Sequence, residues 1–316
     1  MIRIFHRVGG EILQEKSVEA LDNIPVDNLL WIDLRDYEKN ERENVELKLG
    51  IKLQTATEAA EIESSSRYFE TFDTIYLNNT FLLQQEKGYS GIPVSFAIKN
   101  DVLITARNGD IKVFFETVKK IKSNTRIFKT GYQVLTSIFE TRIDLDADML
   151  EGIARDISFI GKEITIKKEL DEEQIIKITA LQETTMMLRE SIVDTQRVIS
   201  ALLKSELFPN ESLGKLRVMV KDTGSLLNHT SFSFERLEYL QNTFLGLLNI
   251  EQNKTIKIFT VVSVIFMPPT LIASMYGMNF AILPEKDWKY GYPFAIALMI
   301  LSSLITLYIF RRKKWL

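Results

Sequence analysis

The residues Tyr276-Gly277-Met278-Asn279 close the first of two uncharged, apolar runs near the end of the sequence. The runs extend from Ile258 to Tyr276 and from Tyr290 to Phe310. At about 1.5 Å per helical residue, each run is roughly 30 Å long, which matches the hydrocarbon core of a bilayer. Two such runs back to back, followed by a basic terminus, are hard to bury as core helices of a soluble protein. The pattern therefore predicts a membrane hairpin.

Lysine and arginine are distributed unevenly around the two predicted spans. Lys254 and Lys257 precede the first span, and a basic tail at 311–316 follows the second, whereas the charges in the loop 280–289 cancel. Loops rich in Lys and Arg stay in the cytoplasm. We therefore expect a multi-pass protein of the plasma (inner) membrane, with both chain termini in the cytoplasm and the 280–289 loop outside.

The overall composition excludes several classes of protein. A formal net charge of −3 over 316 residues gives no reason to expect a nucleic-acid partner. The absence of cysteine rules out disulfides and thiol catalysis, and the two histidines, His6 and His229, are too few for a His-rich metal site. Met1 to Gly10 carries Arg3 and Arg7, so we expect no signal peptide. The sequence also lacks a Walker loop and a nucleophile elbow, so we expect neither ATP-driven transport nor an enzyme.

Residues 1–125 alternate short β-rich and helix-like segments and predict a cytoplasmic α/β domain with a mixed sheet. Strands are predicted at Ile2–Arg7, Leu29–Leu34, Thr71–Leu77, Thr80–Glu86, Val94–Lys99 and Val102–Ala106. Helices are predicted at Asp36–Leu49, Thr57–Ser65 and Asp110–Lys122. Asp36 and Asp110 are the expected N-caps, Gly50 the expected C-cap, and Asn100-Asp101 the expected hairpin turn.

Long helices are predicted beyond this domain, because glycine and proline become rare and apolar residues recur at helical spacing. Residues 126–210 are expected to form two long antiparallel acidic helices with a break near Lys168 to Asp171. Phe208-Pro209-Asn210 ends this pair. The third helix is expected over 211–279 and meets no proline until Pro268, so it would run from the soluble part through the first span, 258–276. The second span is expected over 290–310.

One face of the first span combines small polar residues with Ile256 and Met267. The residues recur at alternating spacings of three and four: Asn253, Ile256, Thr260, Ser263, Met267, Thr270 and Ser274. Polar groups on one stripe of a membrane helix face protein or water rather than lipid. The stripe is therefore either the lining of a water path or an ordinary helix-packing face. Pro268 and Pro269 would permit a bend in the middle of the span.

The hairpin resembles that of the CorA family of divalent-cation channels. The resemblance rests on Gly277-Met278-Asn279, placed after Met267-Pro268-Pro269-Thr270 and before the segment Pro284 to Pro293. Trp31-Ile32-Asp33-Leu34 and the basic tail also resemble the family. The resemblance implies an α+β membrane protein that forms a funnel-shaped homopentamer, with one long stalk helix per chain continuing into the pore.

The resemblance also implies a pore lining and a selectivity filter. The implied pore-lining residues are Asn253, Ile256, Phe259, Ser263, Met267, Thr270 and Ser274, and they differ from the stripe only in having Phe259 for Thr260. The implied filter is Gly277, Met278 and Asn279. Mg²⁺ keeps much of its water shell, and a ring of asparagine amide oxygens can accept hydrogen bonds from that water without holding the ion too tightly. Gly277 would let the backbone turn and approach its neighbours. The structural alternative is that Gly277 and Asn279 only cap the helix.

Acidic residues cluster in the expected cytoplasmic helices, around Asp144, Asp146 and Asp148. Their spacing is that of an EF-hand start, but glycine is missing at 149 and Arg155 replaces the closing glutamate, which excludes that motif. Such runs are usually solvated helix faces. The resemblance implies instead a layer that senses cytoplasmic Mg²⁺, with a stalk-helix carboxylate near Arg217. This chain has Val218 at the matching position and Asp222 one turn on, so Asp222 is the candidate regulatory ligand.

Together these observations predict a channel that passes Mg²⁺, and Co²⁺ or Ni²⁺, into the cytoplasm and is gated by cytoplasmic Mg²⁺. Mg²⁺ is then both the transported and the regulatory ion, and no organic cofactor is expected. The expected partners are further copies of the chain, membrane lipid and divalent cations. Two alternatives stay open: a zinc-type member of the same family, and a membrane-anchored regulatory protein that transports nothing.

Overall fold

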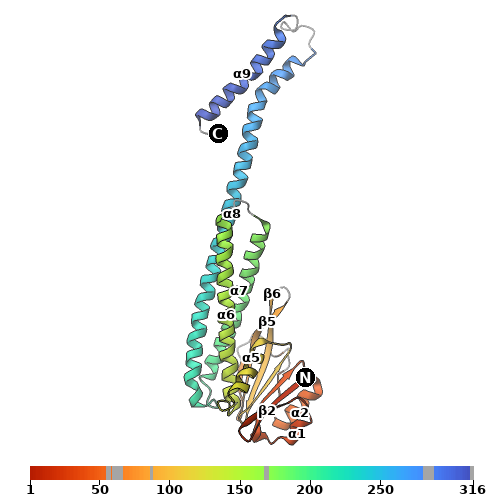
Figure 1. Cartoon of the computed structure of the whole chain (residues 1–316), viewed down its shortest axis with the longest axis vertical. Helices are drawn as coiled ribbons and strands as arrows, with labels where there is room; N and C mark the ends of the chain where they lie inside the picture. The colour runs from red at the N-terminus through yellow and green to blue at the C-terminus, as the bar shows by residue number, and fades with distance from the viewer. Residues whose placement is uncertain (55–57, 59–66, 86–87, 167–170, 280–287, 314–316) are drawn as a thin grey trace. The chain divides into compact units, whose positions relative to one another are not determined.

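The computed structural model describes residues 1–54, 58, 67–85, 88–166, 171–279 and 288–313 (Figure 1). The chain divides into two compact units, Met1–Gln241 and Asn242–Leu316. One helix, α8 (Asn210–Tyr276), contributes residues to both units. Each unit is described by itself below.

A mixed sheet forms the base of the first unit. Its strand order is β2-β1-β3-β7-β6-β5-β4. The strands are β1 (Ile2–Val8), β2 (Glu11–Glu15), β3 (Leu29–Arg35), β4 (Tyr68–Glu70), β5 (Thr74–Gln85), β6 (Gly88–Lys99) and β7 (Val102–Arg107). β3 and β7 pair in parallel, with Ile32 opposite Ile104, and the other neighbouring strands pair antiparallel. The predicted α/β domain with a mixed sheet is therefore confirmed.

Apolar residues fill both faces of this sheet, as the alternation of side chains along a strand requires. Trp31 and Leu103 point to one face, where they join a core with helices α5 (Lys112–Ser123), α6 (Gly131–Ile166) and α7 (Glu172–Leu202). Ile32 and Ile104 point to the other face, where α1 (Ala20–Asn23) and α2 (Lys39–Leu49) cover them. A short 3₁₀ helix, η1 (Val26–Asn28), leads into β3.

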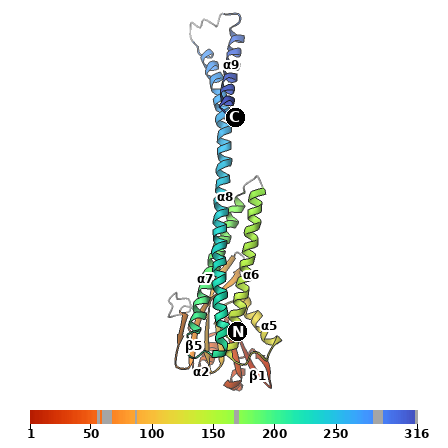
Figure 2. The ribbon, with the colours of Figure 1, turned by 90° about the vertical axis from the view of Figure 1, so that its left-hand side faces the viewer.

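Three long helices rise from the sheet. α6, α7 and the first part of α8 run side by side in both views, with α7 antiparallel to the other two (Figures 1 and 2). Side-chain hydrogen bonds link the three helices. Gln182 on α7 donates to Gln241 on α8 at 3.2 Å, and Arg236 on α8 donates to Ser158 on α6 at 3.1 Å.

Several details differ from the sequence-based predictions. Thr71–Leu77 and Thr80–Glu86 were predicted as two strands, but β5 is a single strand because Asn78 and Asn79 are buried and stay in register with β6. β2 and β4, at the two edges of the sheet, were missed. The predicted N-caps were wrong: Glu38 caps α2 in a reciprocal capping box with Glu41, and Ile111 precedes α5.

Other local predictions are confirmed. Gly50 ends α2 in the left-handed conformation at φ 61°, and Asn100 and Asp101 turn the β6–β7 hairpin at φ 50° and 64°. The predicted helix Thr57–Ser65 lies outside the described residues apart from Glu58. So does the predicted break Lys168–Asp171 apart from Asp171, whose carboxylate accepts from the Glu173 amide to cap α7.

The second unit consists of the rest of α8, from Asn242 to Tyr276, and of α9 (Gly291–Arg312). Both helices are long and apolar enough to cross a membrane. Only 6% and 11% of their most apolar segments is buried inside the structure, so neither is the core helix of a soluble protein. The two C-terminal apolar helices of the predicted fold class are therefore present.

Candidate functional site

The predicted pore-lining residues all lie on α8, within the second unit. Each of them is exposed in the single chain: Asn253, Ile256, Phe259, Ser263, Met267, Thr270 and Ser274. At about 100° per residue, they share one face of the helix. Phe259 and Thr260 lie at similar angles on either side of the centre of this face. The predicted residues therefore lie on one face of α8. The structure of the single chain does not favour Phe259 over Thr260 as the member of this face.

The opposite face of the same segment is half-buried. Its members are Val261, Val264, Ile265, Pro268, Pro269, Ile272 and Tyr276. The centres of the two faces are about 180° apart at 100° per residue. The polar stripe therefore lies within the exposed side of α8, which the described residues of this chain leave uncovered and which also includes Phe266 and Leu271.

Threonine hydroxyls in this segment donate to their own helix. Thr260 donates to the Ile256 carbonyl at 2.8 Å, and Thr270 donates to the Phe266 carbonyl at 2.7 Å. Because the hydrogen is used inside the helix, the hydroxyl oxygen presents acceptor lone pairs outward. Such a surface suits donors such as the water molecules around a cation.

The exposed stripe extends further toward the N-terminus than the sequence analysis found. Asn242, Gly246 and Asn249 are exposed and precede Asn253 at spacings of four, three and four. The seven-residue repeat that identifies the stripe continues upstream of Asn253, and the sequence analysis did not follow it there. The enlarged stripe adds two asparagines, Asn242 and Asn249, whose side-chain amides match that of Asn253.

Gly277, Met278 and Asn279 follow the last helical residue of α8 and are exposed. The Gly277 amide donates to the Ala273 carbonyl at 3.0 Å, and the Met278 amide donates to the Met275 carbonyl at 3.3 Å. Gly277 is not among the residues with positive φ, so it is not the left-handed glycine of a standard helix cap. A Cβ there would lie 3.2 Å from the Ala273 carbonyl oxygen, a tight contact with the backbone of the preceding turn.

The candidate regulatory residue, Asp222, is exposed on α8 in the first unit. Within the part of the chain that the structure describes, no group of three or more His, Asp or Glu side chains could hold a metal ion. The described part of one copy therefore gives Asp222 no such set of ligands.

Asp146 does not belong to a solvated acidic layer, contrary to the reading of the 144–148 cluster. It is 8% exposed, and Arg142 donates to its carboxylate at 3.3 Å. Burial raises the pKa of Asp146, and Arg142 offsets this only in part. Arg142 also donates to Asn79 on β5 at 2.8 Å and to Ser191 on α7, so this node ties both helices to the sheet.

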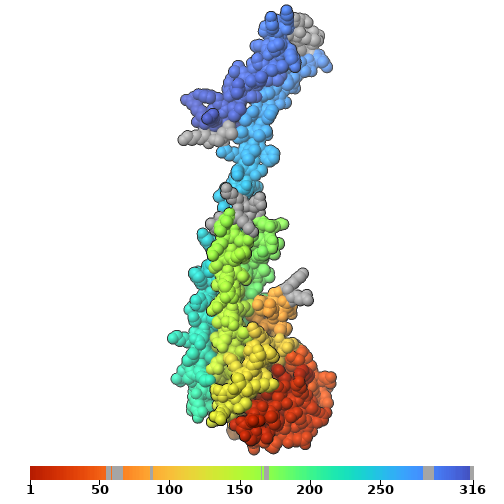
Figure 3. All heavy atoms as spheres, in the orientation of Figure 1, coloured from red at the N-terminus to blue at the C-terminus, as the bar shows by residue number. Residues whose placement is uncertain are grey.

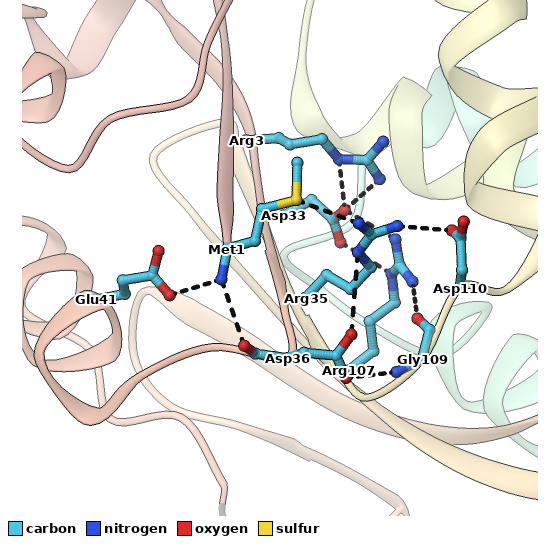
Figure 4. A network of polar contacts seen from close by, with 9 residues as sticks. All are labelled: Met1, Arg3, Asp33, Arg35, Asp36, Glu41, Arg107, Gly109 and Asp110. Carbon is cyan, nitrogen blue, oxygen red and sulfur yellow. Dashed lines mark hydrogen bonds and ion pairs between the residues drawn. The ribbon is translucent and has the colours of Figure 1, made fainter.

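A second buried network surrounds Asp33, part of the Trp31-Ile32-Asp33-Leu34 segment (Figure 4). Arg107 donates to both carboxylate oxygens at 3.1 Å, Arg3 donates at 3.0 Å, and the Thr105 hydroxyl donates at 2.8 Å. Burial raises the pKa of Asp33, but Arg107 and Arg3 outweigh it and hold the pKa below its ordinary value. Because Asp33 on β3 accepts from Arg3 on β1 and from Thr105 and Arg107 on β7, this network holds the three strands together.

Comparison with known proteins places these features in a family. The family model described as "CorA-like Mg2+ transporter protein" matches residues 26–312. The magnesium transport protein CorA of Wolinella succinogenes is 37% identical over 321 residues, covering 100% of both chains. The protein of the same name from Escherichia coli K12 is 35% identical over 302 residues, covering 95% of this chain and 96% of that one.

Solved structures have the same fold. The CorA magnesium transporter of Methanocaldococcus jannaschii matches with a TM-score of 0.82 at 24% identity, covering 100% of this chain and 99% of that one. The cytoplasmic domain of ZntB from Vibrio parahaemolyticus matches with a TM-score of 0.58 at 16% identity, over 79% of this chain and 98% of that one. The family match over residues 26–312 and the full-length relatives show that this chain belongs to the CorA family.

Proposed function

We propose that this chain is the subunit of a homopentameric channel that lets Mg²⁺ enter the cytoplasm down its electrochemical gradient. Co²⁺ and Ni²⁺ are the further ions proposed to pass. The proposal places both termini in the cytoplasm, on the basis of the basic segments around 254–257 and 311–314. A divalent ion gains about 4.6 kcal/mol per 100 mV of inside-negative potential, so the transport needs no chemical fuel.

The observation that carries the proposal is the exposed polar stripe on an apolar helix. From Asn242 to Ser274 it repeats every seven residues without interruption, and no described part of the chain covers it. A strict seven-residue repeat favours helices that supercoil around a common axis. A two-helix hairpin cannot enclose water in a membrane, so several copies must face their stripes toward one another.

The chemistry of the stripe suits a hydrated cation. Asn253, Thr260 and Thr270 offer oxygen acceptors, and none of the residues from Ile258 to Tyr276 carries a charge. Neutral acceptors bind the water around Mg²⁺ weakly enough to release it. Phe259 and Met267, 70% and 65% exposed, are the proposed apolar constrictions, and Asn279 forms the proposed filter with Gly277 and Met278.

Gating by cytoplasmic Mg²⁺ is proposed to act through Asp222. The described residues of one copy bring no group of three His, Asp or Glu side chains together. An ion at Asp222 would therefore take ligands from another copy or from water. Occupied sites of this kind would favour one arrangement of the copies over another.

Liposomes containing the purified protein test the proposal. Influx of Mg²⁺, Co²⁺ and Zn²⁺ is measured with an interior dye, and the particle mass is measured in detergent. We expect Mg²⁺ influx driven by an inside-negative potential and a mass near five chains of 36.5 kDa each. Faster flux of Zn²⁺ than of Mg²⁺ would favour a zinc-type transporter. Absence of any flux from an assembled protein would favour a membrane-anchored regulator instead.

A further inference from the structure

A groove of about 370 Å³ lies between the start of β4 and the C-terminal end of α7. All the charged side chains that line it, among the described residues, are cations: Arg67 directly before β4, Arg197 on α7, and Lys204 just beyond the end of α7. Tyr68 and Ser200 add hydroxyl groups to its walls. We call this the basic groove.

Arg67 is held in place at one wall of the basic groove. Its guanidinium pairs with the Asp194 carboxylate on α7 at 3.1 Å and donates to the Thr80 hydroxyl on β5 at 3.3 Å. Its side chain is only 12% exposed. These contacts use two of the five guanidinium N–H groups, and the buried Nε has no hydrogen-bond partner among the described residues. Arg67 is therefore preorganised and still has donors for a further acceptor.

The other two cations have no such partner. Arg197 and Lys204 are exposed, and neither forms an ion pair within the part of the chain that the structure describes. They are not needed to cap α7, because the backbone amides of residues 203 and 204 donate to carbonyls of the last helical turn at 3.1 and 2.9 Å. Their charges are therefore available to a bound anion.

The acidic residues that neighbour the basic groove do not line it. Asp194 pairs with Arg67, as described above. Glu70 accepts hydrogen bonds from the hydroxyls of Tyr68 and Ser205. Glu206 is exposed and is not a lining residue. The walls of the basic groove therefore present cations and hydroxyl groups without a carboxylate between them.

The basic groove lies at the sheet end of α7. The helix begins at the end of the bundle remote from the sheet, beside α6 (Figures 1 and 3), and Ser205 beyond its other end bonds to Glu70 on β4. Gln182 bonds to Gln241, where the chain continues into the second unit. Arg197 lies about 15 residues further along α7, or roughly 22 Å. This position favours a soluble ligand over a membrane lipid.

We propose that the basic groove binds a small soluble anion that carries two or more phosphate groups. Phosphate oxygens accept charge-assisted hydrogen bonds from guanidinium and ammonium groups, and a planar guanidinium can hold two of them at once. A ligand with several negative charges pairs with Arg67, Arg197 and Lys204 together, whereas a single phosphate group reaches fewer of them. Small-molecule sites typically have volumes of roughly 300–1,000 Å³, and the basic groove falls within this range.

Calorimetric titration of the full chain in detergent, with sodium pyrophosphate as the probe and without Mg²⁺, tests the proposal. We expect one binding event per chain. Arg197→Gln combined with Lys204→Gln should weaken binding about a hundredfold, because each substitution removes a charge-assisted contact worth about tenfold. Both side chains are exposed, so the variant should fold and transport ions as the wild type does.

A matched control combines Lys122→Gln with Arg126→Gln, which removes the same charge from exposed positions outside the basic groove. The control should bind pyrophosphate as tightly as the wild type. Absence of binding to the wild type overturns the proposal. Equal weakening in the control overturns it too, because the anion would then respond only to net charge.

Glycerol 3-phosphate, a soluble lipid headgroup with one phosphate, distinguishes the two sources of phosphate. It should compete with pyrophosphate at least about tenfold less well than unlabelled pyrophosphate does, since it reaches fewer of the three cations. Tighter binding of glycerol 3-phosphate would assign the basic groove to a lipid headgroup and overturn the proposal. These titrations do not measure ion flux, so their failure leaves the proposed channel standing.

Discussion

Replacing Asp33 by Asn tests whether the buried network at the centre of the sheet holds the soluble unit together. Asp33 is 0% exposed, and it is the shared acceptor for Arg3, Thr105 and Arg107. Arg107 is only 2% exposed and stacks over the Phe114 ring at 4.2 Å, so it cannot turn out to solvent. The variant keeps the shape of the side chain but leaves that guanidinium buried without its counter-charge.

Removing one partner of a buried ion pair costs about 3–5 kcal/mol. For a unit of this size, about 1 kcal/mol lowers the melting temperature by roughly 2–4 °C, so a fall of roughly 6–20 °C is expected. The contribution of Asp33 also depends on pH. Because its folded pKa is lowered, the stability is fully present above its ordinary value of 3.8 and is lost as pH falls through the folded value.

Thermal unfolding of the purified full chain in detergent, followed at several pH values, measures both effects. The control is Asp22→Asn, an exposed aspartate outside the network. The contribution of Asp33 to the stability of the wild-type protein should change little between pH 8 and 5. If Asp33→Asn lowers the free energy of unfolding by less than about 1 kcal/mol, or by no more than the control does, Asp33 does not hold the strands of the sheet together as described.

Two further predictions concern transport. Thr270→Val keeps the shape of the side chain but removes the acceptor oxygen, so Mg²⁺ flux should fall about fivefold, the effect of about 1 kcal/mol, while Thr306→Val on α9 should change it little. Equal flux in both variants would count against an ion path along the stripe. Millimolar Mg²⁺ should slow proteolysis of the soluble unit, because an ion stabilises whichever state binds it, and Asp222→Ala should remove that protection. Digestion that is the same with and without Mg²⁺ would argue against a regulatory site.

The membrane helices and the sheet could be read from the sequence because their patterns are local. The length of the uncharged apolar run from Ile258 to Tyr276 is enough to predict a membrane span. The strands β3 and β7 are dense in β-branched and large apolar residues, which mark a strand covered on both faces. The Gly50 cap and the Asn100-Asp101 turn follow from residues that tolerate positive φ.

What the sequence missed depends on tertiary contacts. The sequence analysis ended one strand at Leu77 and began the next at Thr80, but the burial of Asn78 and Asn79 against α7 and their pairing with β6 keep them in one strand. Asp146 looked like a solvated acid, although Arg142, four residues earlier, was the visible signal that it could be paired. Glu38 replaced Asp36 as the cap of α2 because Asp36 adopts φ 44° and its carboxylate accepts from the Gly109 amide at 2.7 Å.

The exposed face of α8 could be predicted from the sequence for the same local reason. Seven-residue spacing on α8 identified its exposed face, and the repeat would have revealed Asn242 and Asn249 had it been followed upstream. Gly277 does not need positive φ in the single chain, but a Cβ there would lie 3.2 Å from the Ala273 carbonyl oxygen, a steric restriction that no sequence pattern shows.

Mg²⁺ influx into liposomes containing Asn279→Ala tests the central claim most directly, with Leu304→Ala as its control. Asn279 is exposed beyond the end of α8, so its loss should leave folding and assembly intact while removing the amide oxygens proposed to receive the hydrated ion. Leu304 is 57% exposed on α9 and carries no polar group. We expect near-background influx for Asn279→Ala and near-wild-type influx for Leu304→Ala, in particles of equal mass. Wild-type influx through correctly assembled Asn279→Ala would contradict the account, because Gly277-Met278-Asn279 would then do no more than end a helix.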